Sequence, residues 1–152
     1  MMQRIALIAA GLLLMQLAMS CRIGWTSYED SCYTVITDGQ PWIGAQDVCE
    51  MLNGHLVTIS TSDENSAVYQ LVKNATDDRA WIGLHDLERQ GHFQWVTTNR
   101  EANYTNWDTT WGQEPNNQHG NESCVELRSF TGGRWNDLPC SRNLPFVCES
   151  ST

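Results

Sequence analysis

Six cysteines constrain this chain more than any other feature, because their number is even and all of them follow an apolar N-terminal stretch. In a small exported chain, such a count predicts three disulfides that staple one domain. The count alone does not say which cysteines pair. The chain has no Cys-x-x-Cys pair, which disfavours a structural zinc site. The six are Cys21, Cys32, Cys49, Cys124, Cys140 and Cys148.

Residues 1–20 have the pattern of a secretory signal peptide. Arg4 supplies one positive charge, an apolar run follows, and the small residues Ala18 and Ser20 precede the expected cut. The run is shorter than the roughly 18–20 apolar residues that cross a bilayer, which disfavours a membrane anchor. A lipoprotein interpretation of Cys21 is also disfavoured, since the residue three positions before it is alanine rather than leucine. We expect a secreted, extracellular protein.

Length and composition limit the remainder to one ordered domain, residues 21–152. A chain of 152 residues has room for one domain with a moderate core, and its 41% hydrophobic content excludes a disordered chain. Its net charge of −9 argues against nucleic acid and against anionic membranes as partners. Three glycosylation triplets, at Asn74, Asn103 and Asn121, also fit export, although such triplets often arise by chance.

Two helices are predicted in the first half of the domain. Residues 41–52 begin with a proline and end before Asn53-Gly54, and their apolar face is expected to hold Val48, Met51 and Leu52. The second helix follows Thr61, which has a glutamate three residues later, the spacing of a capping box. An apolar stripe then continues along it, formed by Ala67, Val68, Leu71 and Val72.

Short strands and one long loop make up the rest, which predicts an α+β fold. Strands are expected at residues 32–36, 55–59, 80–84, 93–96, 124–128, 133–135 and 146–148. Residues 97–121 lack apolar periodicity but contain Tyr104, Trp107 and Trp111, which disordered segments seldom have. A loop of this length in a small domain is typically functional when it is ordered, and we expect an ordered functional loop here.

Two acidic clusters offer oxygen ligands for a metal ion. Glu114 and Asn116 precede Glu122, and Asn136 and Asp137 form the second cluster. Three carboxylates and two carboxamides suit Ca²⁺, whereas zinc prefers histidine or cysteine. The simpler interpretation of each cluster by itself is a solvated acidic loop.

Taken together, the motifs of this chain resemble the C-type lectin-like domain, and the resemblance runs from Cys21 to about Glu149. Each motif is common by itself, but their joint order and spacing are specific. In chain order they are Cys21-x-x-Gly-Trp25, Cys32-Tyr33, Cys49, Trp81-Ile-Gly-Leu84, Glu114-Pro-Asn116, Cys124, Trp135-Asn-Asp137, Cys140 and Phe146-Val-Cys148-Glu.

The resemblance implies a fold and a disulfide pattern. The fold is a C-type lectin-like domain with two helices, short antiparallel sheets and a long calcium-binding loop region. The family pairs its cysteines as Cys21–Cys32, Cys49–Cys148 and Cys124–Cys140 would here. Since no thiol is left over, any homo-oligomer is expected to be non-covalent.

The resemblance also implies a sugar site. In sugar-binding members, the residues matching Glu114, Asn116, Glu122, Asn136 and Asp137 ligate one Ca²⁺, and two neighbouring sugar hydroxyls complete its coordination. The peptide before the residue matching Pro115 is cis in those members, which X-Pro bonds tolerate. The order Glu-Pro-Asn is similar to that of mannose-type members, which bind mannose, GlcNAc, glucose or fucose. Galactose-type members carry Gln and Asp instead.

Two departures from the family pattern bear on the site. Of the four positions that hold an auxiliary Ca²⁺ in many members, only Asp86 is acidic here; the others are Gln90, Asn117 and Ser123. We therefore expect one strong Ca²⁺ site and an auxiliary site that is weak or absent. The segment 108–113 is longer than in compact members and adds Trp111. This tryptophan is expected either to stack on a sugar ring or, as the favoured alternative, to pack within the loop.

The expected function is that of a secreted calcium-dependent lectin for mannose-type glycans on microbial or cell surfaces. A plausible role is the recognition or agglutination of microbes in innate immunity. The alternative is a lectin-like domain recruited for a non-sugar partner such as a protein, a mineral or ice. No nucleophile–base pair or catalytic motif is present in the sequence, so an enzyme is not expected.

Overall fold

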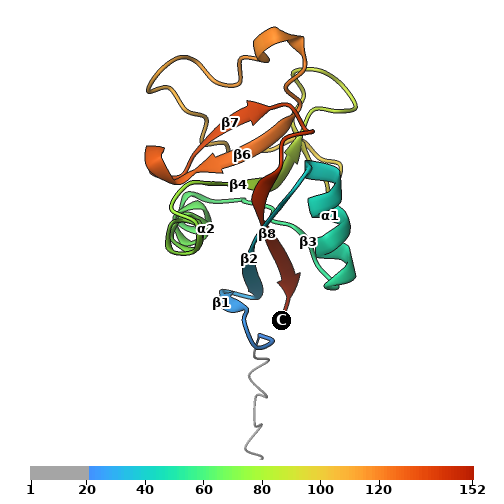
Figure 1. Cartoon of the computed structure of the whole chain (residues 1–152), viewed down its shortest axis with the longest axis vertical. Coiled ribbons are helices and arrows are strands. Elements are labelled where there is room, and N and C mark those ends of the chain that lie inside the picture. Colours follow the sequence, from blue (N-terminus) through green and yellow to red (C-terminus); the bar gives the residue numbers. More distant parts are fainter. Residues whose placement is uncertain (1–20) are drawn as a thin grey trace, which may run out of the picture.

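The computed structural model describes residues 21–152, so the predicted signal peptide lies outside the described residues. Two helices lie on either side of a sheet, as Figure 1 shows. They are α1 (Trp42–Met51) and α2 (Ser62–Ala75), with the short 3₁₀ turns η1 (Gln118–Gly120) and η2 (Ser129–Thr131). Within the described part of the chain, no helix is long and apolar enough to cross a membrane.

The strands join into one sheet with the order β1-β2-β8-β4-β6-β7, in which β3 also pairs with β8 and β5 with β4. Their bounds are β1 Thr26–Tyr28, β2 Ser31–Gln40, β3 His55–Leu56, β4 Arg79–His85, β5 Gln94–Trp95, β6 Cys124–Arg128, β7 Arg134–Leu138 and β8 Leu144–Ser151. The pairings are antiparallel except where Trp81 of β4 lies beside Phe146 of β8. The expected short antiparallel strands thus join into one sheet, and β1 is a strand that was not predicted from the sequence.

The three disulfides confirm the pattern that the family resemblance implied: Cys21–Cys32, Cys49–Cys148 and Cys124–Cys140. The second joins α1 to β8 and closes the longest loop of the three. The pairing of β2 with β8 brings the two ends of the domain together at the bottom of Figure 1, while the long loop before β6 lies at the top. The candidate site and the two ends of the described domain, residues 21 and 152, are thus at opposite ends of the domain.

Both helices form where the sequence predicted them, but the buried face of α1 differs from the prediction. Its buried residues are Trp42, Ala45, Gln46 and Cys49, whereas Met51 is 75% exposed. The disulfide at Cys49 turns that side of the helix toward the sheet. The buried face of α1 is therefore not the predicted one, and Val48 and Leu52 are only partly buried at the edge of the core.

The cap predicted at the start of α2 is present, with the return bond of the capping box shifted by one residue from Thr61 to Ser60. The Glu64 backbone N–H donates to the Thr61 hydroxyl at 3.1 Å, and the Glu64 carboxylate accepts from the backbone N–H of Ser60 at 2.7 Å. These contacts satisfy donors that an uncapped helix would leave open. Val68 and Val72 of the predicted stripe are buried in the core, which also takes up Trp81, Trp95 and Trp135 across its two parts.

Candidate functional site

The long loop, predicted as residues 97–121, is ordered by its attachment to β7. Trp135 of β7 is fully buried, and its backbone bonds to the residues on either side of Trp107. The Trp135 N–H donates to the Asn106 carbonyl at 2.8 Å, and the Trp135 carbonyl accepts from the Asp108 N–H at 2.8 Å. The Trp135 ring packs edge-on against Trp107 and Tyr104. The loop aromatics therefore fix the path of the chain toward Glu114.

Asp137 joins the predicted Glu114-Pro-Asn motif to β7. The Glu114–Pro115 peptide is cis. Beyond it, the backbone N–H groups of Asn116 and Asn117 donate to the two Asp137 carboxylate oxygens at 3.0 and 2.7 Å. The Asp137 side chain is nearly fully buried, so these charge-assisted bonds replace solvent and hold the motif against the strand.

Glu122 closes the same loop from its other end. Its carboxylate accepts a hydrogen bond from the backbone N–H of Gln118 at 2.7 Å, and its own N–H donates to the Asn117 side chain at 3.0 Å. The Asn116 side-chain oxygen also accepts from Gln118 at 2.8 Å. Burial is the main cause that raises the Glu122 pKa, and the Asp137 charge adds to it. Glu122 is thus held near Asp137 at an electrostatic cost.

Glu114 carries the least satisfied carboxylate in this region. The residue is 9% exposed, and its Oε2 atom is buried without a hydrogen-bond partner. Burial raises the Glu114 pKa to about 7, helped by the charges of Asp137 and Glu122 and opposed by Arg128. A buried polar atom without a protein partner needs an explanation, and a bound cation is one of the recognised explanations.

Asn136 is oriented by a buried network behind the loop. Its side-chain amide donates to Glu126 at 3.0 Å, which leaves the Asn136 carbonyl oxygen free to accept. Glu126 is completely buried and also takes ion pairs from Arg128 at 2.8 Å and from Arg79 at 3.4 Å. Arg128 in turn reaches Asp108 at 3.4 Å.

This supporting network was not predicted from the sequence. A charged residue within an alternating strand is usually taken to face solvent, yet four of the five residues of β6 are buried. The available signal was the pair of arginines at positions 79 and 128, two candidate partners for a buried glutamate at position 126.

The five predicted site residues come from two segments, the loop before β6 and strand β7. Hydrogen bonds link Asn116 to Asp137, and Glu122 shares its Gln118 donor with Asn116. In residues 21–152, no three Asp, Glu, His or Cys side chains converge as a ready metal cluster.

The position of the predicted auxiliary site has one further orphan oxygen. Asp86 is buried, its Oδ2 accepts from the Gly91 N–H at 2.8 Å, and its Oδ1 has no partner. The Asn117 side chain is already engaged with Glu122. The expectation of a weak or absent second Ca²⁺ stays a prediction.

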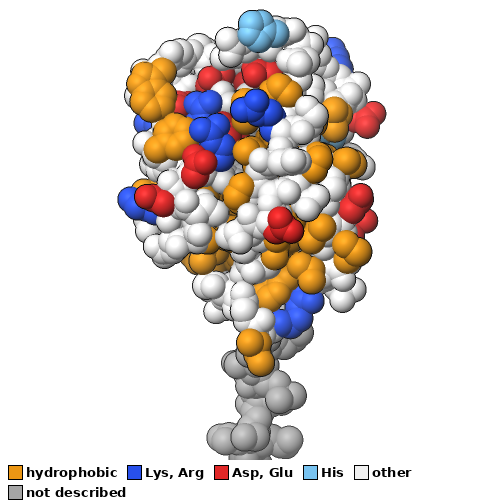
Figure 2. All heavy atoms as spheres, in the orientation of Figure 1, with side chains coloured by type: hydrophobic (Ala, Val, Ile, Leu, Met, Phe, Trp, Pro, Cys, Tyr) orange, Lys and Arg blue, Asp and Glu red, His pale blue; other side chains and the backbone are white. Residues whose placement is uncertain are grey.

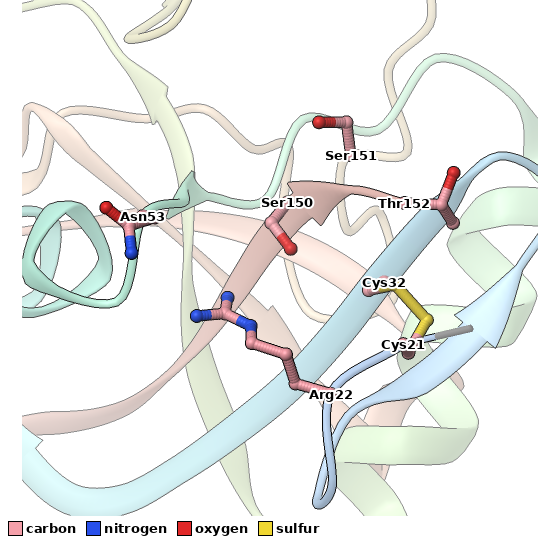
Figure 3. A pocket seen from close by; sticks show the side chains of 7 residues that line it. All are labelled: Cys21, Arg22, Cys32, Asn53, Ser150, Ser151 and Thr152. Atoms are coloured by element: carbon pink, nitrogen blue, oxygen red, sulfur yellow. A yellow bond between two sulfur atoms is a disulfide. The ribbon is translucent and has the colours of Figure 1, made fainter. Parts of the chain in front are cut away.

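A cavity of about 290 Å³ lies among the chain ends, away from these residues. Figure 3 shows Arg22 extending beside the Cys21–Cys32 disulfide toward Asn53 and Ser150. None of the five residues of the predicted calcium site lines this cavity. The asparagines of the three glycosylation triplets, Asn74, Asn103 and Asn121, are all exposed.

Comparison with known proteins agrees with the fold and its disulfides. A sequence model of the Lectin C-type domain matches residues 38–150. The chain is 33% identical over 132 residues to a perlucin-like protein from Mytilus galloprovincialis, covering 85% of this chain and 82% of that protein. It is 34% identical over 137 residues to an alpha-N-acetylgalactosamine-specific lectin from Patiria pectinifera, covering 84% and 79%.

Among solved structures, the C-type carbohydrate-recognition domain of cow CD23 matches with a TM-score of 0.76 and 34% identity, covering 88% of this chain and 97% of that one. The match to the family's sequence model spans most of the domain. The chain belongs to the C-type lectin domain family, a family of binding proteins and not of enzymes.

Proposed function

We propose that this chain is a secreted calcium-dependent lectin that binds mannose-type glycans through one Ca²⁺. The ion would be held by the loop residues Glu114, Asn116 and Glu122 together with Asn136 and Asp137 of β7. The observation that carries the proposal is the buried, partnerless Oε2 of Glu114 among neighbouring carboxylates. A bound cation would supply that partner and would offset both the burial and the neighbouring negative charges that raise the Glu114 pKa.

The donor set fits Ca²⁺ in its chemistry. Oxygens of three carboxylates and two carboxamides are hard ligands, and Ca²⁺ accepts six to eight of them in flexible geometry. The hydrogen bonds already present do not exclude this role, because each carboxylate oxygen has more than one acceptor position. Asp137 can hold the Asn116 and Asn117 N–H groups and still face a cation. Bound Ca²⁺ would leave coordination positions for two neighbouring sugar hydroxyls.

The order of Glu114 and Asn116 supports the mannose-type assignment. Ionised glutamate can only accept a hydrogen bond from a sugar hydroxyl, whereas the asparagine amide can donate one. The Asn116 carbonyl oxygen already accepts from Gln118, so its NH₂ group is the end left to donate. One hydroxyl would therefore donate to Glu114 and its neighbour would accept from Asn116.

Secretion and a role in microbial recognition or agglutination are parts of the same proposal. They are supported by the signal-peptide pattern, by three disulfides and by exposed glycosylation triplets. One small site makes few contacts, so its affinity for a single sugar is expected to be weak, on the order of millimolar. Dense glycans or a non-covalent oligomer would then supply avidity.

Affinity chromatography tests the proposal directly. Residues 21–152 are loaded on mannose–agarose and on galactose–agarose in Ca²⁺, and then eluted with EDTA. Retention on mannose alone with release by EDTA is the expected result. Retention on galactose would refute the mannose-type assignment. If multivalent mannose also fails to bind, the lectin assignment fails in favour of a non-sugar partner.

The double variant Glu114→Gln, Asn116→Asp is expected to exchange the sugar preference. The double variant places the hydrogen-bond donor at position 114 and the acceptor at position 116. A mannose hydroxyl pair would then leave hydrogen-bonding groups of the site unpaired, which should lower the mannose affinity about tenfold or more. The comparison is the ratio of mannose to galactose affinity in saturating Ca²⁺. Glu50→Gln, a change in an exposed glutamate of α1, is the matched control. An unchanged ratio in the double variant would refute the role of this motif in specificity.

Calcium affinity is expected to fall as the pH drops below about 7. Without Ca²⁺ the Glu114 pKa lies near 7 instead of 4.5, so the folded chain binds a proton that the cation must displace. One displaced proton weakens binding about tenfold for each pH unit below 7. Isothermal titration with Ca²⁺ between pH 5.5 and 8 measures this slope.

The same shift sets the sign of the stability change in EDTA. The raised pKa means that the folded state holds more protons than the unfolded state between pH 4.5 and 7, so stability falls as the pH rises through this range. The gain in Tm on adding Ca²⁺ should therefore grow with pH. Glu114→Gln, which cannot titrate, should have a clearly shallower pH slope than the unaltered chain, the remainder coming from other carboxylates with raised pKa values such as Glu122. An unchanged slope would assign the proton to another group.

A further inference from the structure

Trp111 and Phe130 form an exposed aromatic pair outside the proposed calcium site. Trp111 is 73% exposed and Phe130 is 48% exposed, and their rings stack with centroids 6.1 Å apart and planes 26° apart. One face of the indole therefore rests on Phe130, and most of its remaining surface is open to solvent. Two stacked and exposed aromatic rings form a small apolar surface, which makes the pair a candidate contact site.

The pair is held rigidly from below. The guanidinium groups of Arg79 and Arg128 lie 5.2 and 5.7 Å from the centre of the Phe130 ring. Both arginines are ion-paired to the buried Glu126, so neither is free to move away. From solvent to core, the successive layers are thus Trp111, Phe130, the arginine pair and Glu126. Such a support pre-organises the exposed indole and lowers the entropy cost of binding on it.

The same layers continue into the proposed sugar site. Glu126 Oε1 accepts from both Arg128, at 2.8 Å, and the Asn136 amide, at 3.0 Å. Arg128 also pairs with Asp108, whose carbonyl accepts from the Glu114 N–H at 3.0 Å. Trp111 is three residues before Glu114, so their Cα atoms are at most about 11 Å apart. The aromatic pair and the proposed sugar site therefore share one framework.

The surface around the pair is mixed in character. Figure 2 shows hydrophobic side chains beside Lys or Arg and Asp or Glu side chains at the upper left, where Figure 1 places the long loop and the turn between β6 and β7. A sugar ring has apolar C–H faces and a polar rim of hydroxyls. The C–H faces can stack on the indole, and the hydroxyls can form hydrogen bonds with the neighbouring charged groups.

We propose that Trp111, supported by Phe130, is an extended subsite that stacks on a further sugar ring of a bound oligosaccharide. The inference rests on the proposed function, because it places the terminal sugar at Glu114 and Asn116 and the next rings over the indole. It predicts that the chain selects oligosaccharides over single sugars. A glycan is favoured over a protein partner by continuity with the proposed sugar site and by the small size of the aromatic surface.

The experiment compares two probes in saturating Ca²⁺: methyl α-mannoside, which has one ring, and linear mannotriose, which has three. Isothermal titration gives the ratio of the two affinities for each protein. Trp111→Ala is expected to lower the preference for the trisaccharide by about 2- to 10-fold, the value of one aromatic stacking contact. Phe130→Ala, which removes the support, should lower it in the same direction.

Ile43→Ala is the matched control, because Ile43 is 62% exposed on α1 and belongs to neither site; its ratio should equal that of the unaltered chain. An unchanged ratio in Trp111→Ala would overturn the inference and leave the pair as a protein contact. An equal loss for both sugars would also overturn it, since that result indicates damage to the loop. Failure of the unaltered chain to bind either sugar would refute the proposed function itself, and the inference with it.

Discussion

Replacing Cys49 and Cys148 together by alanine is expected to lower the free energy of unfolding by about 4–5 kcal/mol. The two residues are 99 positions apart, and the disulfide restricts nearly the whole unfolded chain. Both are also fully buried in the cluster under α1, so the loss of sulfur packing adds to the effect. For a domain that is stable by only 5–15 kcal/mol, a loss of this size removes a large share of the total. Urea unfolding of the oxidised protein in EDTA measures it.

The Cys21–Cys32 double alanine variant is the internal control. Its disulfide spans only 11 positions, for which the same chain-entropy relation gives about 3 kcal/mol. The long-range disulfide should therefore be worth about 2 kcal/mol more than the short one. Equal losses would show that loop length does not set the contribution, and that local packing at α1 and β2 does.

Much of the fold could be predicted from sequence because its signals are local. The Thr61–Glu64 capping box marked the start of α2, and Asn53-Gly54 marked the end of α1; Asn53 indeed adopts a left-handed backbone conformation. Strand β6 was predicted with its observed bounds. Strand β3 was predicted too long, because Val57 and Ile59 are buried by packing although they follow the end of the strand.

What could not be predicted depends on contacts between distant segments. The buried side of α1 is set by the bridge from Cys49 to β8, and no periodicity within the helix reveals it. The long loop is ordered by the hydrogen bonds between Trp135 and the residues on either side of Trp107. Its aromatic residues signalled order, but not the strand against which they pack.

The candidate site, too, has a part that the sequence predicts and a part that depends on contacts between distant segments. Its five residues could be named from sequence, because the resemblance to a family supplied their positions. The role of Glu126 could not, since it depends on Arg79 and Arg128 meeting the Asn136 amide behind the loop. The partnerless Glu114 oxygen is a property of three-dimensional burial, and no spacing in the sequence predicts it.

Asp137→Asn is expected to abolish most of the stabilisation that Ca²⁺ gives. Asp137 accepts hydrogen bonds from Asn116 and Asn117, and its charge acts on both Glu114 and Glu122. The substitution removes a proposed carboxylate ligand and turns one acceptor into an NH₂ group that faces a backbone donor. Even changes outside the ligand shell weaken metal binding 10- to 100-fold, so about 100-fold is a conservative expectation for a ligand.

The measurement is the free energy of unfolding in EDTA and in Ca²⁺ at about 100 times the Kd of the unaltered chain. Ca²⁺ should add about 2.7 kcal/mol to that chain and only about 0.4 kcal/mol to Asp137→Asn. Asp47→Asn, which removes the same charge from an exposed position of α1, should keep the full increment. If Asp137→Asn does not fold, Glu122→Gln tests the same ion at a second ligand. An undiminished Ca²⁺ increment in either folded variant would mean that the ion binds elsewhere, because the proposed site cannot lose a carboxylate ligand without losing affinity.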